Sequence, residues 1–206
     1  ALTAAAAAAI PAFRKMFPNE VLAPGQIVSV TNITLLMAEL CGTNELYQSL
    51  GDGPAFGKIR EHLLQIDDTI KSHGGAVVKF VGDGVLATFQ ESESAMSAIA
   101  SLLSSENASL PVRLALHRSS ALVTTLNDRL DYFGEALHLL RMMLQRTEPD
   151  EATLTANVLP AQEPLVIPQN DVLHITPVEY MLPNTAIVAY RCRRNVPLSQ
   201  KSQSVD

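Results

Sequence analysis

Lys79 and Asp83 are the residues of this 206-residue chain whose types and spacing first suggest chemistry. They lie in a segment that predicts a β-hairpin, because alternating apolar residues flank a tight Gly82-Asp83 turn. A carboxylate fixed at the tip of a short hairpin is well placed to hold a divalent cation. In the alternative interpretation, Asp83 only forms the turn and Lys79 is a solvated strand residue. The hairpin taken alone favours that alternative.

Two further segments favour a functional role for Lys79 and Asp83. The hairpin 76–84 (AVVKFVGDG) resembles the "KTIGD" hairpin of the class III nucleotidyl cyclases. Upstream, 34–42 (TLLMAELCG) is similar to the family's first strand, and downstream, 126–134 (LNDRLDYFG) is similar to its "LDYFG" segment. Three segments in the family's order are far more specific than one short motif. The resemblance covers roughly residues 17–193 and implies an α+β fold, a ferredoxin-like mixed β-sheet with helices packed on it.

The resemblance implies a chemistry, the conversion of ATP into cyclic AMP and pyrophosphate. In the family, two carboxylates of one subunit bind two metal ions, Mg²⁺ or Mn²⁺. Here these positions are Glu39, where the family has Asp, and Asp83. Mg²⁺ tolerates the displaced glutamate oxygens poorly, whereas Mn²⁺ tolerates them better. In the alternative interpretation Glu39 is a solvated residue at a strand end. The phosphate-cradling loop corresponds to Gly42 and Thr43, followed by Asn44 where the family has Thr.

The purine-recognising pair of the family falls on Lys79 and Asp131. These residue types accompany adenine, since a lysine can donate to a ring nitrogen and an aspartate can accept from the exocyclic amine. The alternative is a plain salt bridge between the two side chains. Because both types and both contexts match, we favour purine recognition.

The residues that stabilise the family's transition state are replaced. The asparagine position is His138, and the arginine position is Met142. Arg141 lies one residue early, about 100° around a helix from the required direction. The phosphate-binding lysine aligns with Met181. His138 could donate to a phosphate when protonated, although a lone histidine on a helix is more often a surface residue.

Hydrophobic periodicity predicts the elements that position these residues. A helix over 54–72 is expected to bury Phe56, Ile59, Leu63, Ile66 and Ile70. Two more helices are expected over 92–103 and 135–146. Strands are expected over 33–40, as a pair over 112–117 and 121–126, and late in the chain over 153–158, 172–175 and 186–192.

Composition sets the class of protein. The length suits one domain, which we place at 26–194 between a connecting segment at 1–25 and a disordered tail at 195–206. The net charge of −6 argues against a nucleic-acid surface, and no apolar run reaches membrane length. Two cysteines without metal or disulfide spacing indicate reduced thiols and a cytoplasmic location. The alanine-rich start indicates the edge of a longer protein.

These observations predict a degenerate adenylate cyclase-like domain with weak or no turnover, serving cyclic-nucleotide signalling or regulation. One alternative is an active cyclase that prefers Mn²⁺, and another is a non-catalytic dimerisation or ATP-binding module. The family's site lies between subunits, so a homodimer is expected. A heterodimer with an intact cyclase is the other possibility, in which this chain would give Glu39 and Asp83.

Overall fold

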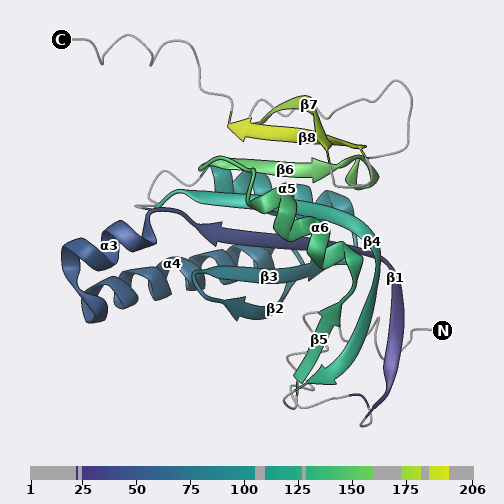
Figure 1. Ribbon diagram of the computed structural model, residues 1–206, viewed down its shortest axis with the longest axis horizontal. Coiled ribbons are helices and arrows are strands. Elements are labelled where there is room, and N and C mark those ends of the chain that lie inside the picture. Colours follow the sequence, from purple (N-terminus) through teal and green to yellow (C-terminus); the bar gives the residue numbers. More distant parts are fainter. Residues whose placement is uncertain are drawn as a thin grey trace.

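A mixed β-sheet of eight strands forms the centre of the molecule (Figure 1). This computed structural model describes residues 22, 25–104, 110–126, 129–159, 173–181 and 186–194. The strands are β1 (Ile27–Leu40), β2 (Ala76–Val81), β3 (Gly84–Phe89), β4 (Val112–Leu126), β5 (Arg129–Phe133), β6 (Glu151–Thr155), β7 (Leu173–Met181) and β8 (Ala186–Arg194). They are ordered β2-β3-β1-β4-β6-β8-β7, and β5 pairs with β4. Among the strand pairs of the described residues, only β4 and β6 run parallel. The α+β class is therefore confirmed.

Helices cover both faces of this sheet (Figure 1). The helical elements are α3 (Thr43–Leu50), α4 (Asp52–Ser72), α5 (Ser92–Leu103), α6 (Glu135–Leu144) and the short 3₁₀ helix η1 (Ala156–Val158). Apolar residues of α4 and α5 share one core cluster with Leu36, Leu114 and Leu154. Residues of α6 share a second cluster with Leu35 and Ala115, which point to the opposite face because side chains alternate along a strand. The second cluster holds α6 over β1, β3 and β4.

Several sequence-based expectations are wrong in detail. The segments predicted as a strand pair, 112–117 and 121–126, form the single strand β4. They are separated by Arg118, Ser119 and Ser120, and none of these residues has the turn-forming strength of glycine or proline. The predicted strand 153–158 ends at residue 155 and continues as η1. Phe56 is 58% exposed rather than buried with the rest of its helix face.

Strand β1 is longer than predicted and bends. Its pairing with β4 shifts register between Val30 and Ile33, and Asn32 has a left-handed φ of 55°. An extra residue of this kind bends and twists a strand. The outer halves of β1 and β4, together with β5, therefore leave the main sheet as an arm (Figure 1). This arm carries Asp131 toward β2.

His117 gives the fold a pH dependence. It is buried in β4, and its Nδ1 lies 2.8 Å from Oγ1 of Thr155. Burial lowers the pKa of His117, and Glu135 acts in the opposite direction. The unfolded chain therefore binds the proton more readily, and stability is lost as the pH falls below about 6.5, the ordinary histidine value.

We expect the urea midpoint of unfolding to fall between pH 7 and pH 5 more steeply for the wild type than for His117→Gln. A group that exchanges one proton contributes at most about 1.4 kcal/mol per pH unit. The matched control is His174→Gln, which changes an exposed histidine of β7. Equal slopes for the wild type and His117→Gln would show that His117 does not cause the effect.

Candidate functional site

The β2–β3 hairpin docks its tip onto the end of β1. The backbone N–H of Leu40 donates to the carbonyl of Asp83 at 3.0 Å, and Oγ1 of Thr43 donates to Oδ2 of Asp83 at 2.5 Å. A Cβ on Gly84 would lie 2.6 Å from the carbonyl oxygen of Ala38, so only glycine permits this close approach. The hairpin predicted from the sequence is confirmed, and its carboxylate is held in place.

The loop after β1 forms the second side of this edge. Gly42 has a left-handed φ of 78° and directly precedes α3, a helix that the sequence analysis missed. The N–H of Cys41 donates to the carbonyl of Pro111 at 2.8 Å, which ties the loop to the start of β4. Thr43 is buried beneath it. Gly42 and Thr43 thus lie beside Asp83, and their role in holding phosphate stays a prediction.

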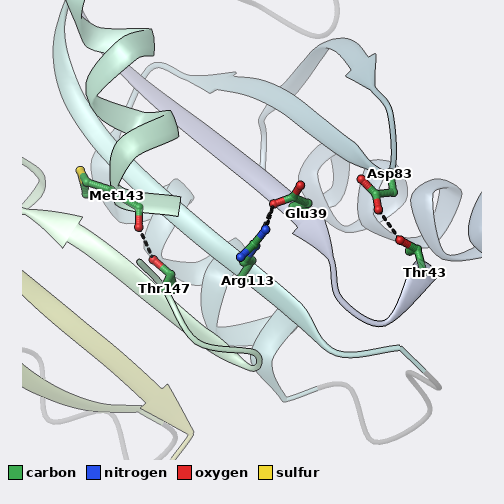
Figure 2. A network of polar contacts seen from close by, with 6 residues as sticks. All are labelled: Glu39, Thr43, Asp83, Arg113, Met143 and Thr147. Carbon is green, nitrogen blue, oxygen red and sulfur yellow. Dashed lines mark hydrogen bonds and ion pairs between the residues drawn. The ribbon is translucent and has the colours of Figure 1, made fainter. Parts of the chain in front are cut away.

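Glu39 is paired with an arginine that the sequence analysis did not single out. Glu39 lies opposite Gly84 of β3 and opposite Arg113 of β4. Its Oε2 accepts from Nη2 of Arg113 at 2.5 Å and from Nε at 2.7 Å. Figure 2 shows the two carboxylates at one edge of the sheet, Glu39 bonded to Arg113 and Asp83 to Thr43. Glu39 is therefore not simply solvated.

Lys79 and Asp131 meet although 52 residues separate them. Nζ of Lys79 lies 2.5 Å from Oδ2 of Asp131 and 5.9 Å from the centre of the Phe133 ring. Oδ1 of Asp131 accepts from the N–H of Tyr132 at 2.8 Å. The contact agrees with both sequence interpretations, so purine recognition stays a prediction.

Helix α6 presents the replaced positions. His138 is exposed, and Met142 is half-buried. The end of α6 is fixed, because Oγ1 of Thr147 donates to the carbonyl of Met143 at 2.8 Å (Figure 2). Met181 is the last residue of β7, and its side chain lies outside the described part of the structure.

A cavity of about 260 Å³ lies between α6 and the sheet. It is lined by apolar residues and by four charged ones, Glu39, Lys79, Arg113 and Arg141. Neither His138 nor Met142 is among the described residues that line it. The structure thus brings Glu39 and Lys79 to one cavity and leaves the two replaced positions outside it.

The donor set suits a hard divalent cation only in part. Glu39 and Asp83 offer carboxylate oxygens, the ligands that Mg²⁺ and Mn²⁺ prefer. Among the described residues, no group of three histidine, cysteine, aspartate or glutamate side chains is placed to hold a metal. Two carboxylates fit a cation that takes its remaining ligands from substrate phosphates and water.

Both cysteines are free thiols, as predicted. Burial raises the pKa of Cys192 to about 12. Burial also raises the pKa of Cys41, with Arg113 acting in the opposite direction. Thiolates are the reactive form, so neither cysteine is activated for nucleophilic chemistry.

Solved structures similar to this chain are cyclase catalytic domains. The catalytic core of a rhodopsin-guanylyl cyclase with converted specificity, in complex with ATPalphaS, has a TM-score of 0.69 and 11% identity over 82% of this chain and 98% of that chain. The adenylyl cyclase CyaB from P. aeruginosa has a TM-score of 0.63 and 16% identity over 84% and 100% of the two chains. The chain has the class III nucleotidyl cyclase fold.

A third structure agrees with this assignment. The guanylate cyclase domain of RhGC from Catenaria anguillulae, in complex with GTP, has a TM-score of 0.65 and 11% identity, covering 81% of this chain and 98% of that chain. No protein-family model and no curated protein matches the sequence. The cyclase fold is thus shared at sequence identities of 11–16%. Activity and substrate are therefore argued from the residues of the site.

In the described part of the chain, no helix has the length and apolar character needed to cross a membrane.

Proposed function

We propose that this domain is a degenerate adenylate cyclase homologue that binds ATP with a divalent cation and turns it over weakly or not at all. Its role would then be regulatory, within cyclic-nucleotide signalling. The observation that carries the proposal is the distribution of charge. By resemblance, Glu39 and Asp83 fall at the family's metal positions and Lys79 and Asp131 at its purine positions. Helix α6 offers His138 and Met142 in place of the transition-state groups.

The cation-binding half of the site is retained. Glu39 and Asp83 would hold Mg²⁺ or Mn²⁺, which neutralises a triphosphate when bound. Arg113 bonds Glu39 in the structure, and its guanidinium can donate to a phosphate oxygen once it leaves that carboxylate. Thr43 keeps Asp83 oriented during this exchange.

The base-binding half is also retained. Lys79 and Asp131 bond to each other, so each is already oriented and satisfied before a base arrives. Adenine would exchange this pair for two new bonds, a donation from Lys79 and an acceptance by Asp131. Lys79 is partly open to solvent, whereas Asp131 is buried.

The transition-state half is lost. Phosphoryl transfer needs cationic donors at the oxygens where charge develops, and one such arginine is worth about 10³–10⁵ in rate. Met142 offers no charge, and His138 offers one only when protonated. Met181, the aligned phosphate position, is also uncharged. These replacements favour weak or absent turnover.

We further propose a homodimer with this site at its interface. Several exposed apolar residues lie on the strands that carry Lys79 and Asp131 or on β4, which pairs with β5: Phe80, Val81, Leu122, Leu126 and Phe133. Leu122 and Phe133 lie opposite each other in the β4–β5 pair. Such a surface is typical of a subunit contact. Pairing with an intact cyclase would use the same surface and would supply the missing groups in trans.

An active cyclase that prefers Mn²⁺ is the second candidate, because both candidate metal-binding carboxylates, Glu39 and Asp83, persist where the end of β1 meets the tip of the β2–β3 hairpin. A cyclase assay separates the two candidates. Cyclic AMP formation that is lost in Asp83→Ala would favour the active enzyme.

Nucleotide binding tests the proposal. We expect titration calorimetry to show ATP binding that Mn²⁺ tightens at least about tenfold, because the cation neutralises triphosphate charge next to two carboxylates. Asp83→Asn should remove this tightening. The matched control Asp68→Asn makes the same change on an exposed residue of α4 and should behave as the wild type.

Two results would contradict the proposal. Absence of ATP heat with and without Mn²⁺ would indicate a scaffold rather than a nucleotide-binding domain. Equal tightening by Mn²⁺ in the wild type and in Asp83→Asn would show that Asp83 does not hold the cation.

A further inference from the structure

The cavity beneath α6 belongs to a single chain. Its floor is apolar and comes from the sheet and the helix: Met37, Val85, Leu86, Leu137 and Leu144. Its rim is charged and comes from β1, β2, β4 and α6. An apolar floor with a few polar groups at one side is the usual form of a small-molecule site. The volume of about 260 Å³ suits a small ligand or one part of a nucleotide.

The charges of the rim sum to an excess of positive charge. Arg113 neutralises Glu39, and Asp131 neutralises Lys79. Arg141 makes no ion pair with any residue that the structure describes. The rim therefore carries one uncompensated guanidinium, which favours an anionic group on the ligand.

Helix geometry explains why Arg141 reaches this cavity. Leu137, Arg141 and Leu144 follow one another at spacings of four and three residues, which places them on one helix face. All three line the cavity. His138 and Met142 are each one residue later, about 100° around the helix, and do not line it. The rotation that prevents Arg141 from replacing Met142 thus directs it toward the cavity of its own chain.

We propose that this cavity binds an organic phosphate within one chain, with Arg141 holding the phosphate group, Arg113 remaining on Glu39 and the apolar floor holding the organic part. The proposal deepens the proposed function and rests on it for ATP as the ligand. It differs from the family's arrangement, in which the resemblance places the phosphate-stabilising arginine in the partner subunit. Here the guanidinium acts in its own subunit, so binding does not need a dimer.

The test uses ATP and pyrophosphate as probes, both in EDTA, with the full 206-residue chain. We expect Arg141→Gln to weaken ATP binding at least about tenfold, the effect of losing one charge-assisted hydrogen bond. Arg60→Gln is the matched control, since it removes the same charge from an exposed position of α4, on the opposite face of the sheet. The dissociation constant should also stay unchanged across protein concentrations at which sedimentation shows monomer and dimer.

The outcomes separate this proposal from the proposed function. ATP binding that is unaffected by Arg141→Gln, or that appears only with the dimer, overturns the single-chain site and leaves the nucleotide function standing. Pyrophosphate binding that depends on Arg141, without ATP binding in EDTA, shows a site for an inorganic anion only and overturns the organic-phosphate site; if ATP also fails to bind in Mn²⁺, the nucleotide function is overturned as well. Absence of binding by both probes in EDTA overturns the single-chain site, and the nucleotide function falls with it only if ATP also fails to bind in Mn²⁺.

Discussion

The triple variant Glu39→Asp/His138→Asn/Met142→Arg is expected to form cyclic AMP about 10³–10⁵-fold faster than the wild-type domain. The arginine and asparagine restore donors to the oxygens where charge develops, and aspartate restores the shorter carboxylate that a divalent cation prefers. Glu39 lies opposite Gly84 of the β2–β3 hairpin, and α6 holds positions 138 and 142 one turn apart. The measurement is cyclic AMP formation with ATP and Mn²⁺.

A matched control isolates the effect of charge. Glu39→Asp/His138→Asn/Met142→Leu keeps an apolar side chain of similar size at position 142 and should lack most of the gain. If the triple variant with arginine is folded and dimeric but no faster than the wild type, the residue correspondence on α6 is wrong.

Unpairing the buried carboxylate of Glu151 is expected to destabilise the fold by about 3–5 kcal/mol. Glu151 is 4% exposed in β6 and forms ion pairs with Arg191 and Arg193 of β8. The double variant Arg191→Gln/Arg193→Gln leaves that carboxylate buried without these partners. Adding Glu151→Gln removes the buried charge and should recover much of the loss, which urea denaturation measures directly.

The two arginines make this comparison sharp. Both are partly exposed, so Glu151→Gln alone leaves cations that water can solvate and should cost less than the double variant. A double variant as stable as the wild type would show that the ion pairs contribute nothing. No recovery on adding Glu151→Gln would show that lost side-chain packing, rather than charge, causes the destabilisation.

Local patterns predicted the elements with strong local signals. Turn residues fixed the hairpin around Gly82 and Asp83, and apolar periodicity placed α5 over its full range and α4 to within two residues. The strand pair predicted within 112–126 failed, because two serines offer no turn signal that could compete with the ladder between β1 and β4. The predicted burial of Phe56 was wrong because periodicity gives the direction of a side chain but not what lies opposite it.

Site residues that lie in family-like sequence segments could be predicted. Site residues that come together only through strand pairing could not. Glu39, Asp83, Lys79 and Asp131 were found through their segments. Arg113 was not found, since its contact with Glu39 depends on the register of two strands 74 residues apart. Likewise, the direction of Arg141 is known from the helix, but the cavity that it faces exists only once α6 packs on the sheet.

Cyclic nucleotide formation by the unmodified domain tests the central claim most directly. The purified homodimer would be assayed with ATP and with GTP, each in Mg²⁺ and in Mn²⁺. We expect turnover that is weak or absent under all four conditions, because the cation-binding and base-binding groups remain while the transition-state donors do not. Rapid formation of cyclic AMP or cyclic GMP by the wild-type homodimer, lost in Asp83→Ala, would contradict this account.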